Sequence, residues 1–267
     1  MLESVDWGVV ESAHQSYKYI DQIGVYVTGT TLETRSITIV GWVAGEKYSE
    51  VQEKKKTLNV MINPKQPIDA IVDNYKIIFY PDSSVRYSVA YNENNEVVCK
   101  FMISGLCADP LFTSIAEHRV VGASTLPKFK FPLIIPKTKG IIMGLRQPSL
   151  IISMENSGAV PTGMRIEFQA NGTVVNPKLI DANTQEFFAV NKTMVAGERI
   201  IINTNDGSKK ISGELNNQVS NYYQYRDLDS TWLKLELGTN LFRYDADTNL
   251  DALEVYVYYS NKYLEVQ

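Results

Sequence analysis

Short strands separated by tight turns dominate the second half of this 267-residue sequence. Leu253–Tyr259 alternates between two faces with the period of a strand. Asn171-Gly172 and Asp206-Gly207 are tight-turn signals, because Asn, Asp and Gly tolerate positive φ. We expect three hairpins, with arms Met164–Gln169 and Thr173–Pro177, Arg199–Thr204 and Lys209–Ser212, and Trp232–Leu237 and Asn240–Tyr244. Short strands with regularly spaced turns predict a β-sandwich or a jelly roll, so the chain is expected to be mainly β.

The first half contains the one helix that the sequence predicts. Apolar residues recur at helical spacing between Lys47 and Met61, and Asn63-Pro64 ends the pattern because proline excludes the helical conformation from the residue before it. Upstream, Gln22–Gly29 and Arg35–Val43 are predicted to pair as a long hairpin through Thr30–Thr34. Three further strands are expected, at Tyr75–Tyr80, Val85–Tyr91 and Glu96–Ile103.

The predicted hairpin needs a partner surface. An isolated two-stranded hairpin is marginally stable in water, and this one carries Ile37, Ile39 and Trp42 on its second arm. The alternating pattern then becomes rare over residues 118–148, which contain Pro127, Pro132, Pro136 and Pro148. We therefore predict two domains, residues 1–139 and residues 140–267.

Composition disfavours several classes of function. A net charge of −4 offers no basic surface for a nucleic-acid backbone. Two histidines (His14 and His118) and two cysteines (Cys99 and Cys107) give no paired zinc spacing, and no phosphate-binding glycine motif occurs. We expect free thiols, no metal, no cofactor and no membrane insertion, in a soluble protein made in a reducing cytoplasm.

The acidic residues raise two further hypotheses, a calcium-binding loop and the active site of a hydrolase. Asp245–Asp251 places oxygen ligands at alternate positions like the start of a calcium loop, but Leu250 occupies the position that needs glycine, so a turn is favoured. A hydrolase could use two converging carboxylates that sequence cannot reveal. This hypothesis ranks well below a non-enzymatic role.

Aromatic residues form one dense cluster near the C-terminus. Tyr222, Tyr223, Tyr225 and Trp232 could stack on sugars, as in a carbohydrate-binding module that recognises host cell-wall glycans. The favoured interpretation is packing or a protein interface, since loop tyrosines commonly line such interfaces. We treat these residues as a candidate ligand or partner surface.

The chain resembles the distal tail proteins of siphophages and prophages of Gram-positive bacteria. The resemblance lies in the order and spacing of several motifs: Val5-Asp6-Trp7-Gly8-Val9, Gln22-Ile23-Gly24, Arg35–Gly41, the helix with its Asn63-Pro64 stop, Tyr75-Lys76-Ile77, Cys99–Ser104, Cys107–Phe112, Ala196–Thr204 and Asp229–Asn240. Each motif is weak alone, and together they span nearly the whole sequence.

The resemblance implies an N-terminal ring-forming β domain with one helix and a long belt hairpin, followed by a galectin-like β-sandwich. Such proteins form a hexameric hub ring below the tail tube, so we expect a structural protein of the phage tail tip. The implied ring interface is the belt, with Val25, Val27, Ile37, Ile39 and Trp42 as its candidate residues. The implied partners are further copies of the chain, the tail tube protein, the tape measure protein, a tail-associated hub or lysin protein, and receptor-binding proteins.

Overall fold

The computed structural model describes residues 1–127, 144–148 and 151–266. They form two compact units, one made of Met1–Ile115 with Tyr263–Gln267 and the other of Ala116–Lys262. The predicted domain boundary between residues 139 and 140 lies outside the described residues, whereas the two units divide between Ile115 and Ala116. Each unit is described by itself below.

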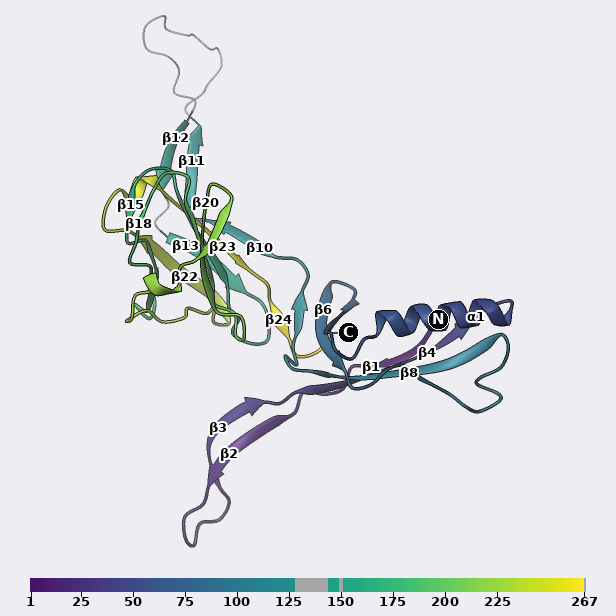
Figure 1. Ribbon diagram of the computed structural model, residues 1–267. Helices are drawn as coiled ribbons and strands as arrows, with labels where there is room; N and C mark the ends of the chain where they lie inside the picture. Colours follow the sequence, from purple (N-terminus) through teal and green to yellow (C-terminus); the bar gives the residue numbers. More distant parts are fainter. Residues whose placement is uncertain (128–143, 149–150, 267) are drawn as a thin grey trace, which may run out of the picture. The chain divides into compact units, whose positions relative to one another are not determined.

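An eight-stranded sheet organises the first unit (Figure 1). Its main path runs β1-β4-β8-β6-β9-β24, while β5 pairs with β6 and β7 pairs with β8. The strands are β1 (Leu2–Asp6), β4 (Arg35–Ala44), β5 (Ile68–Val72), β6 (Tyr75–Pro81), β7 (Arg86–Tyr87), β8 (Val98–Cys107), β9 (Phe112–Ser114) and β24 (Lys262–Tyr263). All three strands expected after the helix are present, although the second is reduced to Arg86–Tyr87.

The core of the first unit lies on one face of β4 and β8. These ten-residue strands pair along their whole length, from Arg35 opposite Cys107 to Ala44 opposite Val98. Alternate side chains of β8 are buried, as the two-residue period of a strand requires, and both free cysteines lie on that buried face. Burial raises the pKa of the Cys107 thiol to about 11, which keeps it protonated at neutral pH.

The predicted helix is confirmed as α1 (Tyr48–Met61). Val51 is fully buried, Leu58 is half-buried against the core, and Lys54 and Lys56 face solvent. Ile62 follows the helix and is also buried, so the apolar stripe continues to the Asn63-Pro64 stop. No helix in the described part of the chain is long and apolar enough to cross a membrane.

The predicted pairing of the N-terminal hairpin is wrong. Gln22–Gly29 and Arg35–Val43 do not pair, because β4 lies inside the sheet between β1 and β8. The hairpin instead consists of β2 (Ser12–Tyr17) and β3 (Tyr26–Leu32), which form a separate two-stranded ribbon (Figure 1). Its tip contains the positive φ angles that a reversal needs, at Asp21 (63°) and Gly24 (82°), whereas no residue of Thr30–Thr34 has one.

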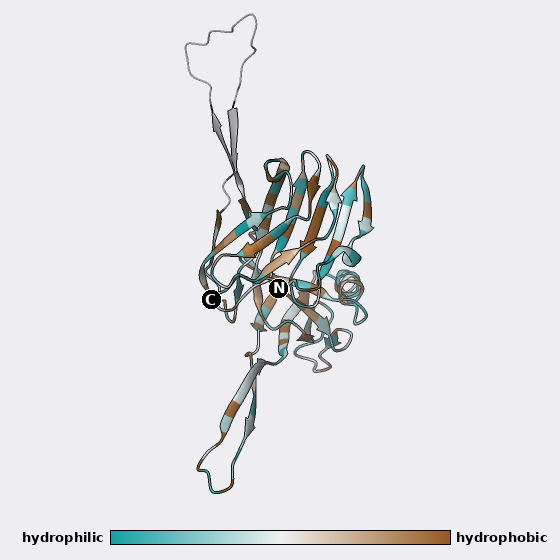
Figure 2. Cartoon of the chain, turned by 90° about the vertical axis from the view of Figure 1, so that its left-hand side faces the viewer, coloured by the Kyte–Doolittle hydropathy of each residue, from teal (hydrophilic) through white to brown (hydrophobic). Residues whose placement is uncertain are grey.

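The second unit is a β-sandwich. A six-stranded sheet runs β10-β23-β14-β19-β20-β21, and a four-stranded sheet runs β13-β22-β16-β17. Figure 2 shows hydrophobic and hydrophilic residues interspersed along these strands. Buried residues from both sheets, among them Phe168, Ile200, Val255, Leu179 and Phe242, form one core between them. The predicted mainly β architecture with a C-terminal sandwich is therefore confirmed.

The elements of this unit are β10 (His118–Val121), β11 (Ala123–Pro127), β12 (Gly144–Pro148), β13 (Ile151–Asn156), β14 (Arg165–Ala170), β15 (Val174–Val175), β16 (Lys178–Asp181), β17 (Phe187–Ala189), β18 (Thr193–Met194), β19 (Arg199–Asn203), β20 (Lys210–Leu215), β21 (Gln218–Asn221), η1 (Tyr223–Tyr225), β22 (Gly238–Asp245), η2 (Leu250–Ala252) and β23 (Leu253–Tyr259). Strands β11 and β12 pair with each other, as do β15 and β18.

One of the three hairpins predicted for this unit is confirmed. Strands β19 and β20 pair around Asn205–Gly207, where Gly207 has a φ of 76°. The hairpin around Asn171-Gly172 is wrong, because β14 pairs with β19 and β23 while β15 pairs with β18. The third is also wrong, since residues 232–237 form no strand and β22 pairs with β13 and β16. Turn signals marked where strands end but not which strands meet.

Candidate assembly interface

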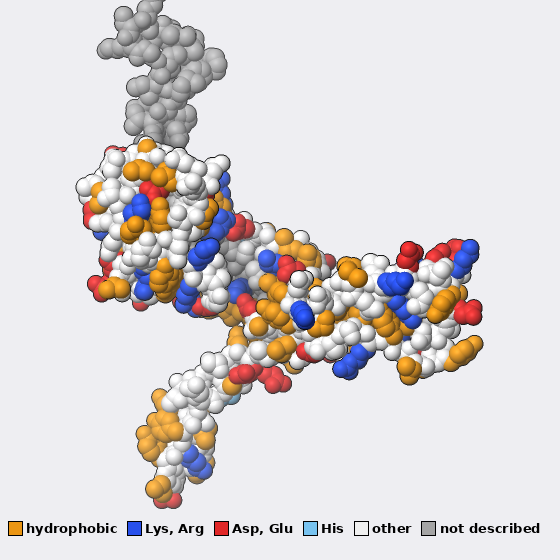
Figure 3. All heavy atoms as spheres, viewed as in Figure 1, with side chains coloured by type: hydrophobic (Ala, Val, Ile, Leu, Met, Phe, Trp, Pro, Cys, Tyr) orange, Lys and Arg blue, Asp and Glu red, His pale blue; other side chains and the backbone are white. Residues whose placement is uncertain are grey.

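The β2–β3 ribbon exposes many large apolar side chains for its size. Ile20 and Ile23 at the tip are 95% and 99% exposed. Six further large apolar side chains along the ribbon are also exposed: Tyr17, Tyr19, Val25, Tyr26, Val27 and Leu32. Figure 3 shows hydrophobic side chains gathered on the ribbon. Contiguous exposed apolar side chains are typical of surfaces that interact with proteins or membranes.

Local contacts hold the ribbon in an extended form. Tyr17 lies opposite Tyr26 with ring centroids 5.3 Å apart, and Tyr19 packs edge-on to Tyr17 at 5.0 Å. The Thr28 hydroxyl donates to the Gln15 carbonyl at 3.1 Å, and the His14 ring lies 3.0 Å from the Thr30 hydroxyl. In the described residues no third strand joins this pair. The ribbon is therefore a preformed arm without a core of its own.

The structure separates the five residues predicted for the belt. Val25 and Val27 lie exposed on the ribbon. Contrary to the prediction, Ile37 is only 1% exposed on β4 and belongs to the core, so no neighbouring subunit can reach it. Ile39 is half-buried against the same core, and the half-buried Trp42 donates from Nε1 to Glu3 at 2.7 Å. The sequence pattern did not predict Tyr17, Tyr19, Ile20 and Ile23 as interface residues, although Asp21 and Gly24, which lie at the tip, are residue types that favour turns.

The structure brings together the four aromatic residues predicted as a partner surface. Tyr222 and Tyr225 pack edge-on at 5.3 Å, and Tyr223 lies 6.3 Å from Trp232. Two cations sit over the Trp232 ring, Lys209 at 5.8 Å and Arg226 at 5.5 Å. We call these four aromatic residues the aromatic patch, in which the Trp232 ring is already engaged by cations and by Phe188 at 4.9 Å.

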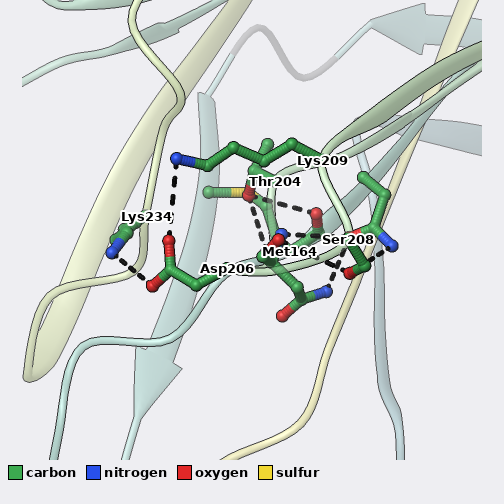
Figure 4. A network of polar contacts seen from close by, with 8 residues as sticks. Met164, Thr204, Asp206, Ser208, Lys209 and Lys234 are labelled. Carbon is green, nitrogen blue, oxygen red and sulfur yellow. Dashed lines mark hydrogen bonds and ion pairs between the residues drawn. The ribbon is translucent and has the colours of Figure 1, made fainter.

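A polar network fixes the turn beside this patch (Figure 4). Asp206 forms ion pairs with Lys234 at 2.7 Å and with Lys209 at 3.6 Å. The hydrogen bond from Lys234 is the largest influence on Asp206 and holds the pKa of its carboxyl below the usual value. Thr204 completes the network by accepting from the Met164 amide at 2.9 Å. The turn therefore presents Lys209 to Trp232 in a defined position.

A buried carboxylate supports the aromatic patch from within. Glu198 is 1% exposed and pairs with Lys192 at 2.8 Å. It also accepts from the Tyr222 hydroxyl at 2.9 Å and from the Val195 amide at 3.0 Å. Burial disfavours the charged form, but these hydrogen bonds outweigh it and lower the pKa of Glu198. The pKa of Tyr222 is raised to about 12, mainly by desolvation and secondly by its hydrogen bond to Glu198.

The candidate catalytic and metal-ligating residues belong to different elements of the two units. His14 is on the ribbon, whereas His118 is exposed on β10 and stacks on Tyr259 at 5.0 Å. In the suspected calcium loop, Asp245 and Asp247 face Lys178 at 3.7 and 3.8 Å. No group of three or more His, Cys, Asp or Glu side chains with metal-binding geometry occurs among the residues that the structure describes.

Comparison with protein families assigns both halves of the chain. The model of the siphovirus-type tail component, C-terminal domain, matches residues 157–263. The model of the phage tail protein RIFT-related domain matches residues 9–103. A comparison with curated protein sequences found no match.

Solved structures share the fold across nearly the whole chain. The crystal structure of SPP1 Dit, described as a paradigm of the hub adsorption apparatus in phages that infect Gram-positive bacteria, matches with a TM-score of 0.67 at 12% identity. The match covers 98% of this chain and 93% of that one. A chain of the phage P2 baseplate in its activated conformation with calcium matches with a TM-score of 0.54 at 12% identity, covering 99% of this chain and 91% of that one.

Both matched domains define a structural component of a siphovirus tail. The chain belongs to the siphophage distal tail proteins and is a structural hub component of the tail tip.

Proposed function

We propose that this hub component forms a closed hexameric ring, in which the β2–β3 ribbon of each copy reaches onto the next copy. The observation that carries the proposal is the ribbon itself, an extended arm that no third strand joins within the described residues and whose tip isoleucines, Ile20 and Ile23, are almost fully exposed. Burying a Val, Leu, Ile or Phe side chain contributes roughly 1.5–3 kcal/mol. Ile20 and Ile23 alone would therefore give each contact a substantial apolar contribution.

The ribbon favours a ring over a symmetric pair. It extends away from the sheet of its own unit (Figure 1), so its tip meets a different surface on a second molecule. A contact between two unlike surfaces is head-to-tail, and it generates a ring when the rotation between copies closes. The family resemblance supplies the number of copies, since distal tail proteins form hexamers.

The proposed position of the ring is between the tail tube and the host-recognition apparatus of the virion. Its proposed neighbours are the tail tube protein, the tape measure protein, a tail-associated hub or lysin protein, and receptor-binding proteins. We assign the chain a scaffolding role without catalysis and expect synthesis in the cytoplasm of the host bacterium.

The aromatic patch is the proposed partner surface of the second unit. Two cations, Lys209 and Arg226, lie over the Trp232 ring that a sugar would otherwise stack on. Tyr223 remains 49% exposed at the edge of the patch. Aromatic residues beside arginine are typical of protein interfaces, so this arrangement supports a protein partner over the alternative of a cell-wall glycan.

A double variant of the ribbon tip tests the proposal. Ile20→Asp with Ile23→Asp places charge where a neighbour would bury apolar surface, at positions that are almost fully exposed in the single chain. We expect native mass to fall from the ring to the monomer, and the monomer to keep a cooperative unfolding transition. Val219→Asp, at an exposed valine of β21, is the matched control and keeps the oligomer. A double variant that assembles like the unmodified protein would contradict the proposal.

A further inference from the structure

We infer that a groove at the far end of β4 receives the ribbon tip of the neighbouring copy. The inference rests on the proposed ring and specifies where the ribbon binds. The groove lies in the first unit, between α1 and the last residues of β4, and has a volume of about 420 Å³. Its lining includes Met1, Trp42, Leu58, Met61, Phe101 and Lys54.

The chemistry of the groove suits the ribbon tip. Most of its lining side chains are apolar. Met1 and Met61 are 95% and 68% exposed, and methionine side chains adapt readily to the shape of a partner. The two tip isoleucines, Ile20 and Ile23, are the most exposed aliphatic side chains of the ribbon. Binding of the apolar tip in the apolar groove would bury apolar surface of both, which favours association.

Charge is complementary at the same place. Asp21 lies at the tip between the two isoleucines, and Lys54 lines the groove. The Lys54 ammonium donates one hydrogen bond to the Ala44 carbonyl at 2.6 Å, which leaves two of its three donors for a carboxylate. An ion pair at the rim would therefore fix the direction in which the tip enters.

The position of the groove identifies its occupant as a second copy. Strand β3 ends at Leu32, just before β4 begins at Arg35, whereas α1 follows the other end of β4 at Ala44. The ten residues of β4 span roughly 33 Å at about 3.3 Å per residue. Figure 1 shows the ribbon and α1 at opposite ends of this sheet. The tip therefore points away from its own groove, and the contact is head-to-tail.

A second cavity of the same unit is the competing acceptor. It measures about 460 Å³ and is lined partly by Glu3, Arg86, Glu93 and Lys100. Lys100 already pairs with Glu3 at 3.2 Å and with Glu93 at 3.6 Å. Burying an isoleucine against these charges would desolvate them without replacing their hydration, which disfavours this cavity.

Disulfide trapping distinguishes the two acceptors. The native thiols of Cys99 and Cys107 are both buried, so introduced cysteines are the accessible ones. We would combine Ile23→Cys with Met61→Cys in the full chain, oxidise the assembled protein with diamide, and analyse it on a non-reducing gel. The matched control combines Ile23→Cys with Val89→Cys, an exposed position beside Ser88 of the second cavity. Ile23→Cys alone controls for links between two ribbons.

A ladder of covalent dimers and larger species from the Met61→Cys pair, absent from both controls, is the expected result. A protein that assembles but crosslinks through Val89→Cys, or through neither position, would overturn the groove and leave the proposed ring intact. A protein that stays monomeric at every concentration would contradict the proposed ring and the groove together. Met61→Asp provides a second readout, since it should lower the native mass while the monomer keeps a cooperative unfolding transition.

Discussion

Gly8 packs directly against the backbone of Ser36, where the chain leaves β1 for the ribbon. A Cβ added to Gly8 would lie 2.1 Å from the Ser36 carbonyl oxygen, and Gly8 has a φ of 65°. The Asp6 carboxylate accepts a hydrogen bond from the Gly8 amide at 2.9 Å and fixes the same bend. The Asp6–Gly8 motif therefore sets the point from which the ribbon extends.

Gly8→Ala should destabilise the first unit by at least about 2 kcal/mol, because left-handed backbone alone costs about 1–2 kcal/mol and the clash with Ser36 adds to it. Denaturant unfolding followed by Trp7 and Trp42 fluorescence, in a Trp232→Phe background, measures the first unit. Gly24→Ala is the matched control, since Gly24 has a φ of 82° but no atom within 4 Å of an added Cβ. Equal effects of the two substitutions would show that the backbone contact does not matter.

Substitution of Ile37 should lower the stability of the first unit without affecting assembly of the ring. Its side chain is 1% exposed, so Ile37→Ala leaves a cavity and should cost roughly 2–5 kcal/mol of unfolding free energy. Ile78→Ala on β6 is the control, because Ile78 is 42% exposed. The same fluorescence assay compares them. Loss of the ring by Ile37→Ala with unchanged unfolding free energy would restore Ile37 to the subunit interface.

Glu198 should make the second unit sensitive to acid. Its folded pKa lies below the ordinary value of 4.5, so its stabilising contribution is present above pH 4.5 and is lost as the pH falls through the folded pKa. Glu198→Gln should cost roughly 1–3 kcal/mol near neutral pH, through lost hydrogen bonds and an unpaired Lys192. The variant should also lose less stability than the unmodified protein on acidification.

Trp232 fluorescence in a Trp7→Phe, Trp42→Phe background reports this unit alone during urea unfolding at several pH values. Glu236→Gln, at an exposed carboxylate of the same unit, should leave the pH profile unchanged. Parallel acid profiles for Glu198→Gln and the unmodified protein would mean that other carboxylates govern the acid sensitivity.

Local pattern predicted elements well and pairings poorly. The helix and β23 follow from periodicity within one segment, and the β19–β20 hairpin follows from a turn that needs Gly207. The main partner of β4 is β8, which begins more than fifty residues after β4 ends. Alternation in Arg35–Val43 cannot reveal such a partner, because a strand presents the same two-residue period whatever it pairs with.

The candidate site shows the same limit. Ile37 and Ile39 are apolar because they face a core, and sequence cannot distinguish such positions from apolar residues that face a neighbour. The aromatic patch was found because its members lie close in sequence. The sequence does not predict the strand Ser12–Tyr17, because its residues are mostly polar and exposed, without the apolar alternation that marks a half-buried strand.

The aromatic patch should bind protein and not sugar. We expect the purified full chain to show no saturable binding to cell walls of Gram-positive bacteria in a sedimentation assay, because Lys209 and Arg226 cover the Trp232 ring. Tyr223→Ala should leave the non-saturable background binding to the cell walls unchanged. Saturable binding that Tyr223→Ala abolishes, with Tyr19→Ala as a control at an exposed tyrosine of the other unit, would instead support the carbohydrate-binding alternative.

The native mass of the purified full chain, measured over a range of concentrations together with negative-stain images of the same sample, tests the proposed ring most directly. We predict six copies in a closed ring at concentrations where the Ile20→Asp, Ile23→Asp variant is monomeric. A stable monomer at every concentration, or a symmetric dimer that the ribbon variant leaves unchanged, would contradict it.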